Sequence, residues 1–217
     1  MFGSVLVGRE MRALDLFCGA GGASVGLAQA GYEVIGVDVK PQPRYPFAFH
    51  QEDALEFPLD GFDLIWARPP CQFATAYQRR PGHVYPSENL IPATRERLQS
   101  SGAPYIIENV TGARKELIDP VLLCGSMFQM DIQRHRLFEL SAPILSPQCD
   151  HTIWTPRFPH AGNRKNLRKT LEIGAWRIPL AIQKKAMGID WMTKPELSQA
   201  IPPAYSKFLA TQMKGRR

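Results

Sequence analysis

Cys71 is the clearest candidate for a catalytic residue in this sequence, because it stands in a stiff loop at the expected end of a strand. The apolar run 62–67 is typical of a buried strand, and the segment Pro69-Pro70-Cys71-Gln72 follows it almost directly. Proline fixes the backbone, and ligands of open α/β sheets bind at the carboxyl ends of parallel strands. A thiolate held there is a strong nucleophile when a nearby cation or hydrogen bond lowers its pKa. Taken alone, a cysteine is more often a small buried apolar side chain.

An acidic residue and two arginines follow later apolar segments in the same way. Glu108 ends the run 104–108, which is otherwise typical of a buried strand, and Arg134 and Arg136 flank His135 before a further apolar run. Because side chains alternate along a strand, the two guanidinium groups fall on the same side. A nucleophile, a carboxyl group and paired guanidiniums at one sheet edge form a candidate catalytic site.

Short apolar runs alternate with helical stretches up to about residue 140, which predicts a mostly parallel sheet with helices on both faces. We therefore expect an α/β, Rossmann-like fold. The expected strands are 12–17, 32–38, 62–67, 104–108 and 137–140, and the expected helices are 23–30, 90–101, 179–187 and 204–213.

A glycine-rich turn joins the first expected strand to the first expected helix. Residues 15–22 read Asp-Leu-Phe-Cys-Gly-Ala-Gly-Gly. Glycines let a ligand approach the backbone, and a helix N-terminus offers free N–H groups. Asp38 ends the second expected strand, where a carboxylate can accept hydrogen bonds from ribose hydroxyls. These features indicate an adenosine-type ligand and leave a dinucleotide and S-adenosylmethionine as alternatives.

The charges are distributed unevenly along the chain. Residues 1–150 hold 13 basic and 17 acidic side chains, a net charge of −4, whereas residues 151–217 hold 13 basic and 3 acidic ones, a net charge of +10. Such a basic block suits phosphate groups, with a basic face kept for solubility as the alternative. Frequent prolines mark 141–179 as a small basic lobe between a catalytic, cofactor-binding domain (1–140) and C-terminal helices that return to it (180–217).

Composition excludes several classes of protein. No apolar run approaches the roughly 20 residues of a membrane helix, and the N-terminus lacks a secretory pattern. Four widely spaced cysteines give no disulfide framework and suit a reducing cytoplasm. Cys149, His151 and His160 lie close in sequence, but a tetrahedral zinc ion needs a fourth ligand. We interpret these three residues as part of a polar loop and expect no metal.

The segments described above resemble, in order and spacing, the motifs of C5-cytosine DNA methyltransferases. The matching segments are 15–22 with Ser24 to Leu27, Pro70-Cys71-Gln72, Glu108-Asn109-Val110, Arg134 with Arg136, and Gln199 to Ala204. The resemblance covers 14–140 and resumes at 199–208, and the segment Leu123–Phe128 is similar to compact bacteriophage or prophage members. It implies the fold of S-adenosylmethionine-dependent methyltransferases and a role in DNA methylation or restriction-modification.

The resemblance implies transfer of a methyl group from S-adenosylmethionine to C5 of a cytosine that is flipped out of the helix. Cys71 would attack C6 of the ring. Glu108 would hydrogen-bond ring N3 and the exocyclic amine, which also rejects thymine. Arg136, together with Arg134, would hold the carbonyl oxygen of the base and stabilise the thiolate.

The resemblance also implies contacts with the cofactor and the substrate. Phe17 would pack against the adenine, Gly19 and Gly21 would lie beside the methionine moiety, and Asp38 would bind the ribose. Asp53 matches the acid that takes the adenine amine, with an ordinary helix N-terminal acid as the alternative. The remaining expected contacts are Pro70 for the cofactor pocket and, for the substrate, Gln72, Asn109, Arg164, Lys165 and Arg168.

DNA is the expected partner, in duplex form, because the basic lobe offers cations for phosphates and aromatic rings for bases. We expect a monomer in the absence of DNA, in the cytoplasm of a bacterial or phage-infected cell. Two alternatives stay open: the same chemistry on RNA or on a free cytosine nucleotide, and a catalytically inactive nucleic-acid-binding relative. The many cations argue against a mononucleotide, and the intact set of Cys71, Glu108 and Arg136 argues against an inactive relative.

Overall fold

The computed structural model describes residues 9–71, 74, 88–151, 158–160, 163–168, 171–176 and 178–216, with the backbone alone for 158–160 and 163–168. Most of the described strands join in one sheet. Its strands are β1 (Arg12–Leu16), β2 (Glu33–Val37), β3 (Ala48–His50), β4 (Leu64–Ala67), β5 (Tyr105–Asn109), β6 (Val121–Leu123) and β7 (Arg136–Leu140).

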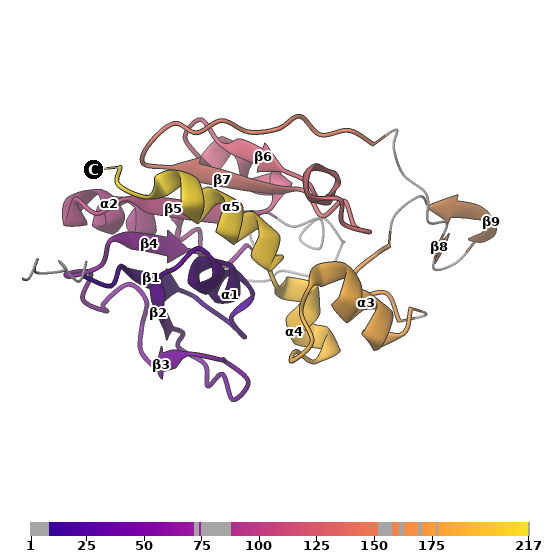
Figure 1. The fold of residues 1–217 in the computed structure, drawn as a ribbon, viewed down its shortest axis with the longest axis horizontal. Coiled ribbons are helices and arrows are strands. Elements are labelled where there is room, and N and C mark those ends of the chain that lie inside the picture. The colour runs from indigo at the N-terminus through magenta and orange to yellow at the C-terminus, as the bar shows by residue number, and fades with distance from the viewer. Residues whose placement is uncertain are drawn as a thin grey trace, which may run out of the picture.

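The strands of this sheet lie in the order β3-β2-β1-β4-β5-β7-β6 (Figure 1). The first five strands in this order run parallel to one another, and β7 runs antiparallel to both β5 and β6. The chain moves outward from β1 in one direction through β2 and β3 and in the other through β4 and β5. Ligands of open α/β sheets bind at such a reversal of strand order. The loops after β1 and β4 therefore meet where a ligand is expected.

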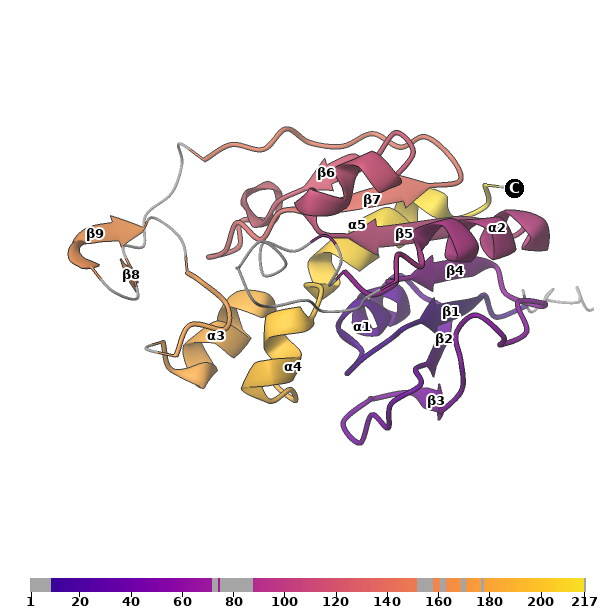
Figure 2. The ribbon, with the colours of Figure 1, turned by 180° about the vertical axis from the view of Figure 1, so that it is seen from behind.

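Helices cover both faces of the sheet (Figures 1 and 2). The helical elements are α1 (Gly22–Gln29), α2 (Ile91–Ser101), α3 (Leu180–Met187), α4 (Lys194–Gln199) and α5 (Pro203–Met213), with 3-10 turns at η3 (Thr111–Glu116) and η4 (Gly125–Phe128). The helices α1 and α5 pack on one face, and α2 and η3 pack on the other.

The side chains of the central strands point alternately to the two faces of the sheet and so contribute to both cores. Ala13 and Leu64 pack with α1 and α5, whereas their neighbours Leu14 and Ile65 pack with α2. Successive side chains of a strand point to opposite faces, so strands covered on both sides are apolar throughout. This is why the central strands are nearly continuous apolar runs in the sequence.

A glycine at the crossing of α1 and α5 brings residues 198–202, called the C-terminal segment below, to the glycine-rich turn. A Cβ atom at Gly26 would lie 2.0 Å from Ser206 Oγ and 2.2 Å from the carbonyl oxygen of Pro203. The hydroxyl of Ser206 donates to the carbonyl of Ala23 at 2.8 Å. The close approach places the residues before α5 beside the start of α1.

The helices α3 and α4 form a smaller third core, which includes Ala20 and Ile132. A hairpin of β8 (Phe158–His160) and β9 (Asn163–Arg168) stands apart from the main sheet (Figures 1 and 2). Within the described part of the chain, no helix is long and apolar enough to span a membrane.

The predicted fold class is confirmed: the sheet is mostly parallel, with helices on both faces. Every expected strand and helix is present, with ends that differ by a few residues. The sequence analysis missed β3, β6, α4 and the β8–β9 hairpin. The division at residues 140 and 179 stays a prediction.

Candidate active site

Cys71 follows β4 in a loop that is fastened to the next strand. The amide Nδ2 of Asn109, at the end of β5, donates to the carbonyl of Pro69 at 3.1 Å. Asn109 Oδ1 accepts the N–H of Val110 at 3.0 Å. Both ends of this buried amide are thus used by backbone groups, which gives Asn109 a positioning role. The contact with substrate that we expected for Asn109 stays a prediction.

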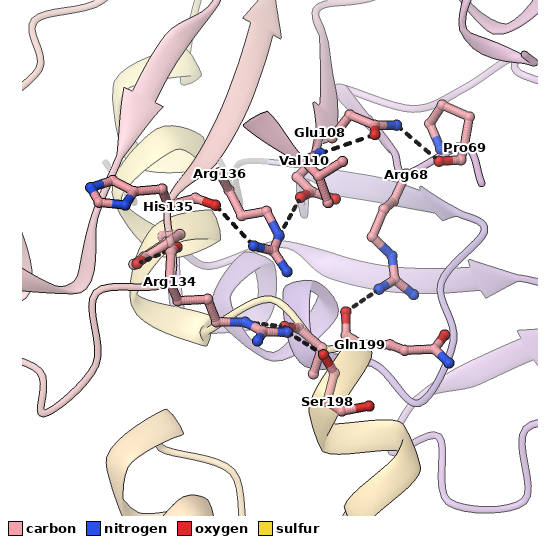
Figure 3. Close-up of polar contacts among 12 residues, drawn as sticks. Arg68, Pro69, Glu108, Val110, Arg134, His135, Arg136, Ser198 and Gln199 are labelled. Atoms are coloured by element: carbon pink, nitrogen blue, oxygen red, sulfur yellow. Dashed lines mark hydrogen bonds and ion pairs between the residues drawn. The ribbon is translucent and has the colours of Figure 1, made fainter. Parts of the chain in front are cut away.

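The buried Glu108 pairs with the partly buried Arg136 beside this loop. Arg136 Nε lies 3.2 Å from Glu108 Oε1, and Arg136 Nη1 donates to the carbonyl of His135 at 2.8 Å (Figure 3). Although the two atoms are close, their alignment does not make a hydrogen bond, and Oε1 has no hydrogen-bond partner among the described residues. This oxygen is therefore free to bind a polar group of a ligand.

Burial raises the pKa of Glu108, and the positive charges of Arg136, Arg68 and Arg134 act in the opposite direction. Glu108 is only 2% exposed, so the effect of burial on its pKa dominates. A carboxyl group with a raised pKa can hold a proton and donate it in a hydrogen bond. Figure 3 shows the guanidinium group of Arg136 directed toward Glu108, and those of Arg134 and Arg68 directed toward Ser198 and Gln199.

The pKa of the Cys71 thiol depends on the same charges. Burial has the largest effect and raises this pKa, and the negative charge of Glu108 raises it further. The positive charges of Arg68 and Arg136 lower it. The raised pKa means that the thiol form predominates in the free protein at neutral pH. The structure thus brings three of the predicted catalytic residues, Cys71, Glu108 and Arg136, within electrostatic reach of one another.

Arg134, the fourth predicted catalytic residue, binds the segment that precedes α5. Its Nε donates to the carbonyl of Ala200 at 2.9 Å, and its Nη2 donates to those of Ser198 and Ala200, both at 2.7 Å (Figure 3). The hydroxyl of Tyr205 in turn donates to the carbonyl of Arg134 at 3.1 Å. Arg134 therefore positions the C-terminal segment, and its direct part in catalysis stays a prediction.

A cavity of about 200 Å³ lies between the glycine-rich turn and the C-terminal segment. Asp38 holds the turn in place, because its Oδ2 accepts the N–H of Gly19 at 3.0 Å and its Oδ1 accepts that of Lys40 at 2.9 Å. The lining residues are Asp15, Cys18, Gly19, Ala20, Gly22, Ala23, Lys40, Gln42, Arg68, Met192, Pro195, Glu196, Gln199, Ala200 and Ile201.

Only Gly19 of the expected cofactor residues belongs to this lining, as far as the described residues show. Phe17 follows β1 with a φ of +58° and packs against the core under α2. Gly21 adopts a φ of +83°, which a side chain would strain. Asp53 is exposed, and its Oδ1 accepts the N–H of Leu55 at 2.8 Å, as an acid that caps a turn does. The cofactor roles of Phe17, Gly21, Asp38, Asp53 and Pro70 stay predictions.

The sequence analysis missed Asp15 as a site residue. Its side chain is 1% exposed and lines the cavity, and the hydroxyl of Ser24 donates to its Oδ2. Burial raises the pKa of Asp15 to about 7 against the effect of this hydrogen bond. An acidic residue inside an apolar strand was the signal in the sequence, because a buried carboxyl group is costly unless a hydrogen bond or an opposite charge compensates it.

Arg68, which the sequence places near Cys71 with either an effect on its pKa or exposure to solvent as alternatives, extends from the Cys71 loop to the cavity. Its Nη1 donates to the carbonyl of Gln199 (Figure 3). Its Nη2 donates to the carbonyl of Phe17 at 3.5 Å. A Cβ atom at Gly19 would lie 2.8 Å from Nη2. Arg68 therefore lines the cavity, and its charge also acts on the Cys71 thiol.

The expected substrate contacts are described only in part. Gln72 lies outside the described residues, and Arg164, Lys165 and Arg168 lie on β9, of which the structure describes the backbone. Their contacts with DNA stay predictions.

The expectation of a polar loop around Cys149 and His151 that lacks further metal ligands is wrong. The chain folds back and places both residues beside Cys124 and His135. His160, the third residue that we considered in the sequence, does not belong to this group as described.

Comparison with known proteins gives a likeness in fold to methyltransferases. No family model matches the chain, and no curated protein sequence matches it. Three solved structures align with 59%, 59% and 60% of the chain: a protein described as a DNA modification methyltransferase encoded within an E. coli prophage (23% identity, TM-score 0.43), a triple mutant of DNMT2 from Spodoptera frugiperda (20%, 0.42) and the Dnmt2 methyltransferase of S. pombe (19%, 0.41).

The chain spans about half the length of these structures, with 45%, 48% and 48% of them covered. The geometry of Cys71, Glu108 and Arg136, and not this likeness, supports the function proposed below.

Proposed function

We propose that the protein is an S-adenosylmethionine-dependent DNA methyltransferase that modifies C5 of cytosine. One observation carries this proposal: a buried carboxyl group with a raised pKa, Glu108, lies against Arg136 and within electrostatic reach of a half-buried thiol, Cys71. A nucleophile, a proton donor and a cation at one point are what addition to an electron-poor pyrimidine requires.

The cavity beside the glycine-rich turn suits the amino-acid part of the cofactor. Asp15 is buried there with a pKa raised to about 7, and an ammonium group beside it would favour its ionised form. Gly19 lets a ligand approach the backbone closely. Asp15 and Gly19 would hold the amino acid, and Asp38 would hold the ribose. When bound, S-adenosylmethionine supplies the methyl group.

Glu108 would recognise the base. In its protonated form the carboxyl group donates to ring N3 of cytosine, and its other oxygen accepts from the exocyclic amine. Thymine carries a proton at N3 and a carbonyl at C4, so the same arrangement rejects it. Protonation of N3 draws electrons from C6 and makes this atom open to attack by sulfur.

Cys71 would then form a bond from sulfur to C6. Its proton must first pass to solvent, and Arg68 and Arg136 both favour the thiolate that remains. Arg136 would also donate to the carbonyl oxygen of the base, where negative charge develops. After methylation, the C5 proton passes to solvent, the electrons of the C5–H bond restore the C5–C6 double bond, and the bond from sulfur to C6 breaks to release the Cys71 thiolate.

The base must leave the stack before Cys71 can reach it, which costs a few kcal/mol. The net charge of +10 in residues 151–217 would offset this cost through contacts with phosphate groups. We propose the basic segment of β8 and β9 as the part that contacts DNA.

Nucleoside mass spectrometry tests the proposal without a guess about the target sequence. The protein and its Cys71→Ala variant are expressed in cells that lack cytosine methylation, and DNA and RNA are digested separately. We expect 5-methylcytosine in DNA with the intact protein and none with the variant. Binding of labelled cofactor by the purified variant is the control for folding. Modification of RNA alone, or none while the cofactor binds, would overturn the DNA assignment.

A further inference from the structure

Four side chains with metal-binding atoms meet beside the catalytic strand β7. Cys124 follows β6, His135 precedes β7, and Cys149 and His151 lie in the segment that leads to β8. Their two sulfur atoms and two imidazole nitrogens all lie within 4.8 Å of one another. The cluster uses two of the four cysteines and two of the five histidines in the sequence.

The spacing of these atoms is close to that of a tetrahedral metal site. Zinc binds sulfur at about 2.3 Å and imidazole nitrogen at about 2.0 Å, so the ligand atoms of a tetrahedral site lie roughly 3.3 to 3.8 Å apart. The Sγ of Cys149 is 3.3 Å from His135 Nε2 and 2.7 Å from His151 Nε2, and the Sγ of Cys124 is 3.3 Å from His151 Nε2.

We propose that Cys124, His135, Cys149 and His151 bind one zinc ion as a closed structural site. Two thiolates and two neutral imidazoles are a donor set that favours zinc among the common divalent metals of a reducing cell. Both thiols lose their protons to solvent on binding, and the two thiolates balance the charge of the ion. Four protein ligands leave no open position for catalysis.

Ser126 gives the cluster an outer hydrogen bond. Its hydroxyl donates to the Sγ of Cys124 at 3.3 Å and lies 3.7 Å from the Sγ of Cys149. Sulfur ligands of structural metal sites commonly accept such hydrogen bonds, which orient them. The hydroxyl of Ser126 therefore lies near both sulfur atoms.

Hydrogen bonds alone explain the cluster less well than a metal does. A thiol has one proton, so Cys149 can donate to one of its two imidazole neighbours only. Thiols are also weak donors and would gain little by gathering three polar partners. A zinc ion satisfies all four groups at once.

The site fixes the start of the basic segment to the catalytic strand. His135 stands between Arg134 and Arg136, and its carbonyl accepts a hydrogen bond from Arg136 at 2.8 Å. Cys149 and His151 directly precede the residues that lead to β8. The metal would therefore hold this segment at a set place beside Arg136, whatever the reaction that Arg136 serves.

Metal analysis of the purified full chain tests the inference, with a purification tag that contains no histidine. We expect one zinc ion per chain. The variants Cys149→Ser and His151→Ala should lose it, whereas the matched variants Cys71→Ser and His50→Ala should keep it. Replacement of zinc by cobalt should give the intense visible bands of a tetrahedral site and a thiolate charge-transfer band. This spectrum needs no variant, so it tests the site even if a variant fails to fold.

Three results would overturn the inference. The first is intact protein without zinc that also gives no tetrahedral cobalt spectrum. The second is full zinc content in a folded Cys149→Ser, His151→Ala double variant, because the metal would then lie elsewhere. The third is a metal-free protein purified under reducing conditions in which mass analysis finds a disulfide between Cys124 and Cys149.

Discussion

Arg136 Nε lies 3.2 Å from Glu108 Oε1 without the alignment of a hydrogen bond. The pair therefore places a cation beside a carboxyl group whose pKa burial has already raised. If the carbonyl oxygen of a bound base draws Arg136 to itself, Glu108 loses part of the charge that opposes its protonation. In the proposed reaction, substrate binding would thus favour the protonated form of Glu108, to which we assign the hydrogen bond with ring N3.

Removing the charge of Glu108 should change the thiol and the reaction in opposite directions. The Glu108→Gln variant lacks an anion that raises the pKa of Cys71. We expect faster alkylation of Cys71 by iodoacetamide at neutral pH, measured by peptide mass spectrometry. Methyl transfer should nevertheless fall by roughly 100-fold or more, because the proton donor is gone. Slower alkylation, or methyl transfer close to that of the unchanged protein, would contradict the assigned role.

Removing the charge of Arg68 should have the opposite effect on the thiol. Arg68 lowers the pKa of Cys71, so Arg68→Met should raise this pKa and move the alkylation profile to higher pH. Arg68→Lys keeps the charge and serves as the control. An unchanged profile in Arg68→Met would show that this guanidinium does not influence the nucleophile.

The contact between Arg44 and Glu196 predicts a loss of stability in acid. Arg44 and Thr193 donate hydrogen bonds to the Glu196 carboxylate, and Arg44 Nη2 lies 2.7 Å from Glu196 Oε1. These contacts hold the pKa of Glu196 at about 2, below the usual 4.5. Because the folded pKa is the lower one, the contribution is complete above 4.5 and is lost as the pH falls toward 2. In urea unfolding, the stability difference between the protein and Glu196→Gln should therefore shrink from about pH 6 to pH 3. A difference that stays constant with pH would contradict this account.

Glu139 should matter far more for stability than a surface partner does. Both its oxygens accept hydrogen bonds from Arg95 at 2.7 Å, and Oε2 also accepts the N–H of Ile118 at 2.9 Å. Its side chain is 2% exposed, so Glu139→Ala should lower the free energy of unfolding by about 3–5 kcal/mol. Arg9 is 66% exposed in its pair with Asp63, and Arg9→Ala should cost less than about 1 kcal/mol. Equal losses in urea unfolding would show that burial is not the decisive factor.

The sequence was sufficient to predict the central strands and to place Cys71 and Glu108 at one edge of the sheet; their catalytic roles stay predictions. Strands covered on both faces are continuous apolar runs, and Cys71 and Glu108 stand where two of these runs end. Parallel neighbours β4 and β5 then bring the two residues to one edge of the sheet. These patterns are local in the sequence, so they can be read without knowledge of the tertiary structure.

Contacts between distant segments could not be predicted in this way. The strands β3 and β6 have three residues each, too few to show a period. Arg134 resembles a catalytic residue in sequence, yet its partners Ser198 and Ala200 come from the far end of the chain. Cys124 and His151 are separated by 27 residues and meet because the chain after β7 turns back past the start of that strand.

Trapping of the covalent intermediate tests the central claim most directly. In DNA that contains 5-fluorocytosine, fluorine at C5 cannot leave as a cation, so the bond between Cys71 and C6 should persist after methyl transfer. With S-adenosylmethionine present, we expect a complex that survives denaturation and whose mass equals protein, DNA and one methyl group. The modified peptide should contain Cys71, and Cys71→Ala should give no complex. Absence of the complex from a folded protein that binds both cofactor and DNA would contradict the account.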